Sequence, residues 1–410
     1  MKYCIIIGDG MADNSVPELN NLTPLQSANI PVIDTLAKAA TIGSVRTVPV
    51  NVEAGSDTAI LNICGYDPRI YYSGRAPLEA AGSGVGLISG DVAYRCNMVS
   101  LDGEDTPYEE KRILSHNGGS IDSESAIALA TDLTNDPCFQ KALSEAGMKI
   151  YPMPSFRHIA VQNGIDTSNL LTIPPHDHLG EKIKPILPSG NDLAASLNNI
   201  MKLAYGFLNA HPINQTRRAE GKLPANGIWL WAQGTVTNLP SFKEKYNKSG
   251  FVVSAVPLVW GIGNLAGLDI SKVDGATGEL DTNYQGKVDA VIKGFSNGYD
   301  FSILHVEAPD ECTHMGDFEG KIKAIENIDN LVVKDLLNKL DGLNEPYRIL
   351  ILSDHKTLTS TRGHDGDPVP FIIYDSRFNK NNAVDGYSEK ECENGEFINE
   401  GHTLIEHLFR

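Results

Sequence analysis

The segment Tyr347-Arg348-Ile349-Leu350-Ile351-Leu352-Ser353-Asp354-His355 joins a continuous apolar run to a carboxylate and an imidazole. An apolar run of this length is typical of a strand buried on both faces of a sheet. Ligands in open α/β sheets bind at the carboxyl ends of such strands. Asp354 and His355 therefore mark the predicted ligand-binding edge of a sheet, and their side chains suit a divalent cation.

Further side chains of the types that bind metals occur in the sequence, most of them after other apolar runs. They are Asp9 after the apolar run 3–8, Asp310 and His314 after the run 301–306, and His364 after Arg362-Gly363. Taken singly, an Asp-His dipeptide is more often an ordinary turn, and an Asp-x-x-x-His motif is often one face of a helix. Together they predict one site with two metal ions, which at about 3.5–4 Å apart can hold both oxygens of a displacement at phosphorus. Mixed Asp and His ligands suit Mn²⁺, Zn²⁺ or Fe, whereas all-oxygen shells suit Mg²⁺ or Ca²⁺. Mn²⁺ is the predicted ion, with Mg²⁺ or Zn²⁺ as alternatives.

Ser56 is the candidate nucleophile, in the segment Ala54-Gly55-Ser56-Asp57-Thr58-Ala59. The glycine allows a sharp turn, and residues 58–64 are predicted to be helical, so Ser56 would lie at a helix N-terminus that favours anions. A hydroxyl beside a divalent cation there could ionise near neutral pH. A serine before a helix is also a common N-cap, and this reading is compatible with catalysis.

The pattern of the whole chain predicts an α/β fold. Alternating strands and helices favour a mostly parallel sheet with helices on both faces, formed by residues 1–87 and 186–410. Residues 88–185 are predicted to form an inserted, smaller α+β domain that binds substrate as a lid. Its expected hinges are residues 82–86 and 185–188. A length of 410 residues also favours two domains.

Composition excludes several classes of partner. The net charge of −18 disfavours nucleic acid and anionic membranes. The six cysteines form no CxxC pair, which favours reduced thiols and a cytoplasmic location. No signal peptide or membrane-spanning stretch is apparent. An anionic substrate must therefore be attracted by a local basic pocket and by metal ions, and the oligomeric state is left open.

Motifs along the whole chain carry a family resemblance. They are Gly8-Asp9-Gly10-Met11-Ala12-Asp13, the Ser56 segment, Gly74-Arg75-Ala76-Pro77-Leu78-Glu79-Ala80, Tyr94-Arg95-Cys96-Asn97, Ser155-Phe156-Arg157-His158, Trp229-Leu230-Trp231-Ala232-Gln233-Gly234, residues 305–317 and residues 353–370. With these motifs the chain resembles the archaeal-type cofactor-independent phosphoglycerate mutases of the alkaline phosphatase superfamily. The resemblance covers essentially the entire sequence.

The resemblance implies a role for each matching residue. One metal ion would be held by Asp9, Ser56, Asp354 and His355, and the other by Asp310, His314 and His364. The serine would take the phosphoryl group and return it to a different oxygen, interconverting 3-phosphoglycerate and 2-phosphoglycerate. The implied substrate contacts are Arg75, Arg95, Asn97, Arg157 and His158. Guanidinium groups agree with this, since they pair well with phosphate and carboxylate.

Trp260 departs from the family pattern, because many relatives carry a lysine there. If that lysine steadies the transferring phosphate, Trp260 could mark a shift in substrate. Two alternatives to a mutase are left open, and the kinase is the one tied to this position. The first is a small-alcohol kinase of the same family, similar to a homoserine kinase. The second is a metal-dependent phosphatase, in which water is the final acceptor. Phosphoryl transfer to and from a small metabolite is common to all three.

Overall fold

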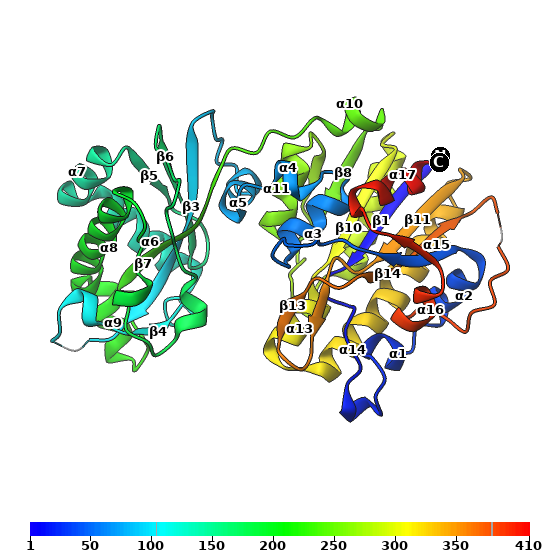
Figure 1. Cartoon of the computed structure of the whole chain (residues 1–410), viewed down its shortest axis with the longest axis horizontal. Coiled ribbons are helices and arrows are strands. Elements are labelled where there is room, and N and C mark those ends of the chain that lie inside the picture. Colours follow the sequence, from blue (N-terminus) through cyan, green and yellow to red (C-terminus); the bar gives the residue numbers. More distant parts are fainter. Residues whose placement is uncertain (104, 379) are drawn as a thin grey trace. The chain divides into compact units, whose positions relative to one another are not determined.

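The structure is a computed structural model that describes residues 1–103, 105–378 and 380–410. The chain divides into two compact units (Figure 1). The first contains Met1–Tyr72 and Asn238–Arg410, and the second contains Ser73–Thr237. In the described ranges, no helix has both the length and the apolar character needed to cross a membrane.

The first unit is built on a sheet of eight strands in the order β15-β2-β14-β11-β1-β10-β8-β9. Their bounds are β1 Lys2–Gly8, β2 Thr41–Val45, β8 Gly250–Val253, β9 Asp269–Ser271, β10 Phe301–Val306, β11 Tyr347–Leu352, β14 Val369–Asp375 and β15 Glu396–Ile398. Only β14 pairs antiparallel with its neighbours, and the other pairs are parallel. The predicted mostly parallel sheet is confirmed.

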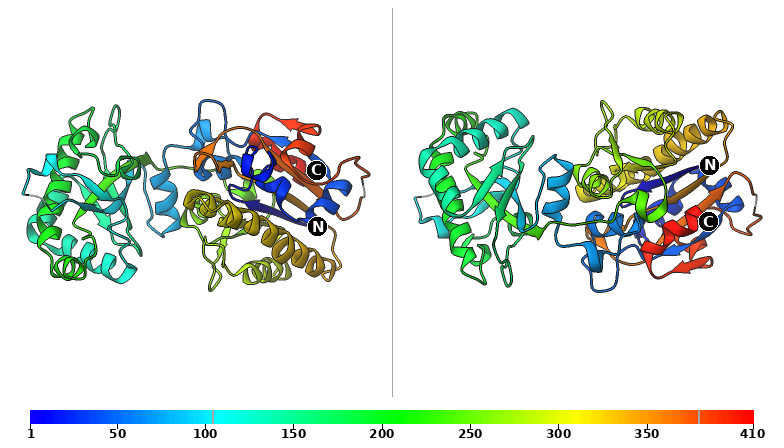
Figure 2. Two further views of the ribbon diagram at one scale, coloured as in Figure 1. Left: turned by 90° about the horizontal axis from the view of Figure 1, so that it is seen from below. Right: turned by 90° about the horizontal axis from the view of Figure 1, so that it is seen from above.

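Helices cover both faces of this sheet (Figure 2). On one face, α2 (Pro31–Ala39), α12 (Tyr284–Ser296), α14 (Phe318–Asn327) and α15 (Lys334–Asp341) share a core with Cys4, Ile6, Leu304 and Ile351. A π-helical turn, Ile328–Val333, joins α14 to α15. The other face carries α3 (Ser56–Ile63), α11 (Pro257–Leu265) and α17 (Leu404–Phe409). The remaining short elements are α1 (Pro24–Ser27), α4 (Pro68–Tyr71), α10 (Phe242–Tyr246), α13 (Ala308–Met315), α16 (Glu389–Glu393), β12 (Lys356–Leu358) and β13 (Gly363–Asp365).

The central strands have the sequence expected for their position. β1 is KYCIIIG, and all seven of its residues are buried because both faces of the sheet are covered. β1 lies between β10 and β11, with Gly8 opposite Val306 and Ile7 opposite Leu352. The three strands therefore end at the same edge, which brings together the residues that follow them.

The second unit has an antiparallel sheet in which β3 (Asp91–Leu101) pairs with three other strands. They are β4 (Ile113–Ser115), β6 (Arg157–Asn163) and β7 (Gly227–Thr235), and β5 (Met148–Tyr151) pairs with β6. One face packs on α6 (Ser123–Asn135), α7 (Pro137–Glu145) and α8 (Leu193–Ala210), and the opposite face packs on α5 (Arg75–Gly82). Another helix, α9 (Pro212–Ala219), follows α8.

The second unit is wider than the insert predicted at residues 88–185. Residues 227–235 were expected in the first sheet, but they pair with residues 92–99 of β3. α8 packs on the same strand β7, and α5 also packs on this sheet, so both helices belong to the second unit. The expected hinges at 82–86 and 185–188 therefore lie inside this unit, and the chain changes unit at 72–73 and 237–238.

Candidate active site

The ends of three parallel strands bring the predicted metal ligands together in the first unit. Asp9 directly follows β1, and Asp354 and His355 follow β11 after one residue. Asp310 and His314 lie on α13, which begins just after β10. His364 comes from β13, which pairs with β12 directly after the Asp354-His355 segment. Strand topology alone thus accounts for the convergence of residues that are 300 positions or more apart, such as Asp9 and Asp310.

Asp9, Asp354 and His355 form the first ligand cluster. The Nε2 atom of His355 lies 3.2 Å from Oδ2 of Asp354 and 3.6 Å from Oδ1 of Asp9. All three residues are buried, with exposed fractions of at most 1%. Asp9 Oδ1 and Asp354 Oδ2 accept no hydrogen bond from any described residue. Two buried carboxylate oxygens without donors, facing one imidazole nitrogen, fit the ligand shell of a cation.

Asp310, His314 and His364 form the second ligand cluster. His314 Nε2 lies 3.1 Å from Oδ2 of Asp310, and His364 Nε2 lies 3.4 Å from Oδ1 of the same carboxylate. The two imidazole Nε2 atoms are 3.0 Å apart. The other ring nitrogen of His314 is 2.8 Å from the carbonyl oxygen of Arg362. If Nδ1 donates to this carbonyl, Nε2 is left with the lone pair that a metal needs.

The electrostatics of both clusters also favour a cation. Burial, with the nearby carboxylates of Asp354 and Asp310, raises the pKa of Asp9 well above its usual range. Burial also opposes ionisation of Asp310, but hydrogen bonds to His314 and His364 outweigh it and hold its pKa well below the usual range. Burial and mutual repulsion therefore both disfavour the charged carboxylates of the first cluster when no cation is bound. A divalent cation would offset that charge.

Ser56 faces the first cluster from the start of α3. Its Oγ lies 3.2 Å from Nε2 of His355. The N-cap of α3 is Gly55, so Ser56 is the first helical residue and does not cap the helix. The capping alternative is therefore wrong, and the hydroxyl is free to act in chemistry at a helix N-terminus that favours anions.

Two residues next to the clusters have no counterpart among the sequence predictions. His305, at the end of β10, has Nε2 2.8 Å from Oδ2 of Asp9, and its Nδ1 lies 3.1 Å from Oγ of Ser254. Burial lowers the pKa of His305 to about 3, so it is neutral. Thr357 has its hydroxyl against Asp310 and His355. A histidine inside a buried strand is a usable signal for His305, whereas a threonine in a three-residue strand gives no such signal for Thr357.

Three of the predicted substrate contacts gather on one face of the second unit's sheet. Glu79 of α5 accepts hydrogen bonds from Arg75 and Arg95, each at 2.9 Å. Arg157 is close enough to lower the pKa of Glu79 as well. Together the guanidinium groups outweigh burial, and this pKa falls to about 2. Arg95 Nη2 is buried and has no hydrogen-bond partner among the described residues. A buried guanidinium nitrogen without an acceptor suits an oxyanion ligand.

Arg75, Arg95 and Arg157 form an arginine cluster, and Asn97 and Trp231 lie beside it. The guanidinium of Arg95 lies 4.5 Å from the centre of the Trp231 ring. Trp231 Nε1 donates to Oδ1 of Asn97 at 3.2 Å. Trp231 thus forms one wall beside these arginines.

His158 lies on the opposite face of the same sheet. The strand register pairs His158 with Cys96 and Arg157 with Asn97, so His158 and Arg157 point to different sides. His158 is only 1% exposed, and its Nδ1 accepts a hydrogen bond from the backbone N–H of Met153. The alternation of side chains along the strand thus separates His158 from the arginines, and a substrate contact for His158 stays a prediction.

Trp260 lies on α11 in the first unit. Its Nε1 donates to the carbonyl oxygen of Ser254 at 2.9 Å, next to the serine hydroxyl that contacts His305. The ammonium of Lys272 lies 4.3 Å from the centre of the Trp260 ring. Trp260 is thus anchored beside the residues that support Asp9.

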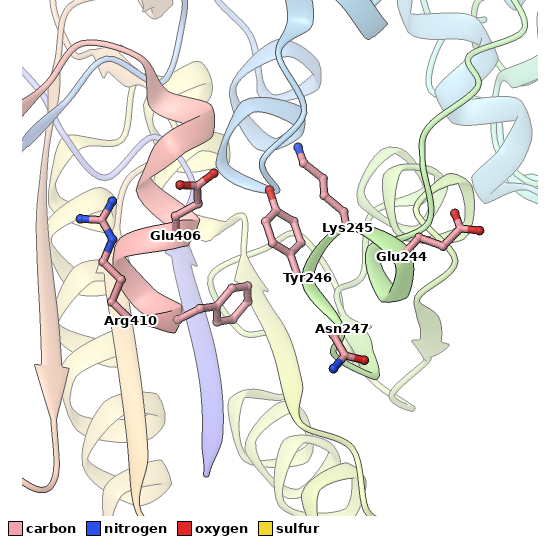
Figure 3. A pocket seen from close by; sticks show the side chains of 7 residues that line it. Glu244, Lys245, Tyr246, Asn247, Glu406 and Arg410 are labelled. Atoms are coloured by element: carbon pink, nitrogen blue, oxygen red, sulfur yellow. The ribbon is translucent and has the colours of Figure 1, made fainter.

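A surface hollow of about 450 Å³ lies away from both clusters. It is lined by Glu244, Lys245, Tyr246, Asn247, Glu406, Phe409 and Arg410 (Figure 3). The Phe409 ring contacts Tyr3 and Phe301, at the first residues of β1 and β10. The hollow is therefore at the opposite end of the strands from Asp9, about 20 Å along β1.

Comparison with known proteins shows the family of the chain. A family model described as the metalloenzyme superfamily matches residues 1–409. The 2,3-bisphosphoglycerate-independent phosphoglycerate mutase of Methanosarcina mazei is 42% identical over 395 residues, which cover 96% of each chain. A probable enzyme of the same name from Geobacter sulfurreducens is 41% identical and covers 99% of both chains.

Two solved structures extend the likeness to the fold. The PH0037 protein from Pyrococcus horikoshii aligns with a TM-score of 0.80 at 30% identity, covering 100% of this chain and 96% of the other. The cofactor-independent phosphoglycerate mutase from Thermoplasma acidophilum aligns with a TM-score of 0.63 at 25% identity, covering 100% and 99%. The chain therefore belongs to the metalloenzyme superfamily and, within it, to the 2,3-bisphosphoglycerate-independent phosphoglycerate mutases.

Proposed function

We propose that this enzyme interconverts 3-phosphoglycerate and 2-phosphoglycerate through a phosphoserine at Ser56. The observation that carries the proposal is the contact of Ser56 Oγ with Nε2 of His355, inside a buried cluster of Asp9 and Asp354. Relatives that are 41–42% identical over nearly the whole chain are named for this activity. A serine at a helix N-terminus beside two sets of metal ligands is the arrangement that phosphoryl transfer needs.

The chemistry conserves all atoms between substrate and product. The Ser56 hydroxyl gives up its proton as Oγ forms a bond to phosphorus, the bond from phosphorus to the glycerate oxygen breaks, and that oxygen takes up a proton. The other hydroxyl of the same glycerate then gives up its proton as it attacks phosphorus, the bond from phosphorus to Ser56 Oγ breaks, and Ser56 is protonated again. Two divalent cations bound at the clusters would lower the pKa of the attacking hydroxyl and offset the charge of the phosphoryl group.

The arginine cluster supplies the recognition of an anion. Arg95 is held by Glu79 and by the Trp231 ring, and its Nη2 atom keeps an open hydrogen-bonding position. We assign Arg75, Arg95, Arg157 and Asn97 to binding the carboxylate or phosphate of the substrate. Because an overall charge of −18 repels such an anion, local guanidinium groups are required.

We propose Mn²⁺ as the bound metal, with one ion at each cluster. The ligands of one ion are Asp9, Ser56, Asp354 and His355, and those of the other are Asp310, His314 and His364. Mixed carboxylate and imidazole sets suit this ion. A cytoplasmic location fits as well, since the six cysteines form no disulfide among the described residues.

Reconstitution with Mn²⁺ is expected to yield close to two ions per chain. His314→Ala should remove one of them and Asp354→Ala the other, because each variant deletes a ligand of a different cluster. Elemental analysis after dialysis measures the stoichiometry. His211→Ala is the control, since its imidazole pairs with Asp132 in the second unit. Unchanged stoichiometry in both cluster variants would place the metals elsewhere.

Activity on three substrate mixtures separates the proposal from its alternatives. The Mn²⁺-loaded protein is expected to convert 3-phosphoglycerate to 2-phosphoglycerate without added 2,3-bisphosphoglycerate. Turnover of homoserine with ATP in place of this reaction would show a kinase. Release of inorganic phosphate at the rate of substrate loss would show a phosphatase.

A further inference from the structure

One buried hydroxyl touches both ligand clusters. Thr357 is fully buried on β12, and its Oγ1 lies 2.6 Å from Oδ1 of Asp310 and 3.2 Å from Nδ1 of His355. Asp310 belongs to the second cluster and His355 to the first. Thr357 also lies opposite His364 in the pairing of β12 with β13. This side chain therefore links the two proposed metal sites.

The direction of its hydrogen bonds follows from its single proton. An ionised carboxylate only accepts, so the hydroxyl of Thr357 donates to Asp310. The oxygen must then accept from His355, and this requires the proton of His355 to be on Nδ1. The Nε2 lone pair is left facing Ser56, Asp354 and Asp9. That tautomer is the one a metal ligand needs.

The surroundings of Thr357 prevent its hydroxyl from turning away. Its backbone N–H donates to the carbonyl oxygen of Ala12 at 3.1 Å, and its own carbonyl oxygen accepts from Lys321 Nζ at 2.6 Å. Gly10 packs so closely that an added Cβ would lie 2.4 Å from Oγ1 of Thr357. Contacts within the protein therefore fix both the strand and the side chain.

We propose that Thr357 is a positioning residue that sets the metal-binding tautomer of His355 and orients Asp310, so that it supports both metal ions through one hydroxyl. The inference deepens the proposed function and rests on its two-metal site. It also explains why a polar side chain is kept in a fully buried place between charged ligands. A hydroxyl shared by two ligands makes the two ions depend on the same residue.

Mn²⁺ binding by the Thr357→Val and Thr357→Ser variants tests this role. Valine keeps the shape of threonine and removes the hydroxyl, whereas serine keeps the hydroxyl. Equilibrium dialysis with elemental analysis is expected to show about 10–100-fold weaker binding of both ions in Thr357→Val. Thr357→Ser should stay close to the parent protein. Parent-like binding by the valine variant, or an equal loss in both variants, would overturn the proposal.

A second measurement needs no change at Thr357. Long-range ¹H–¹⁵N spectra of the metal-free parent protein, with the His355 signals assigned by comparison with His355→Gln, should show the proton on Nδ1. A proton on Nε2 would overturn the proposal even if the valine variant failed to fold. A parent protein that binds fewer than two Mn²⁺ ions would instead contradict the two-metal site, and the tautomer would still decide the role of Thr357.

Discussion

Ser56→Ala is expected to reduce turnover of 3-phosphoglycerate by at least about 10³-fold, because it removes the hydroxyl that we propose as the acceptor of the phosphoryl group. The variant should fold normally. Gly55, and not Ser56, is the N-cap of α3, and alanine is the most favourable residue inside a helix. Steady-state kinetics with the Mn²⁺-loaded protein measures the loss.

Thr58→Val is the matched control for this variant. It lies two residues further along α3, and among the described residues its hydroxyl donates to the backbone carbonyls of Glu53 and Gly55. Its turnover should remain within about tenfold of the parent value, since it touches no reacting atom. A loss below tenfold in Ser56→Ala, with unchanged metal content, would exclude Ser56 as the nucleophile.

Lys321→Met is expected to lower the free energy of unfolding by about 3–5 kcal/mol. Lys321 is fully buried on α14, and its ammonium lies 2.8 Å from Oδ2 of Asp13 and 2.6 Å from the carbonyl oxygen of Thr357. Methionine retains the apolar stem but leaves a buried carboxylate without its counter-charge. Urea unfolding monitored by circular dichroism measures the change.

Lys323→Met provides the comparison on the same helix. Its side chain is 60% exposed and pairs with Glu326 at the surface, so the expected change is below about 0.5 kcal/mol. Equal stability of Lys321→Met and the parent protein would show that the pair with Asp13 is not a structural requirement.

The convergence of the candidate metal ligands was predictable because strand ends in a parallel sheet lie at one edge. Asp9, Asp310 and Asp354 each follow a short apolar run, and the runs became the neighbouring strands β1, β10 and β11. Once these strands are neighbours in the sheet, the three carboxylates must lie near one another. Hydrophobic patterning identifies buried strands well, and their carboxyl ends share one edge.

The hydrophobic pattern of a strand does not specify the strand with which it pairs. Residues 227–235 lie in the range predicted for the first sheet and do form a strand, but this strand pairs with β3 in the second unit, which moves the domain borders. His158 shows a related difficulty, because the motif lists it beside Arg157 while alternation places it on the other face. Thr357 was missed because its role depends on contacts with Asp310 and His355 that only tertiary structure creates.

A phosphoserine at Ser56 is the central claim, and it can be observed directly. The Mn²⁺-loaded protein would be mixed with 3-phosphoglycerate, quenched in acid during turnover and digested for mass spectrometry. The account predicts one additional phosphate on the peptide that contains Ser56, and none in Ser56→Ala. An unmodified Ser56 peptide during active turnover, or a phosphate mapped to another residue, would contradict it.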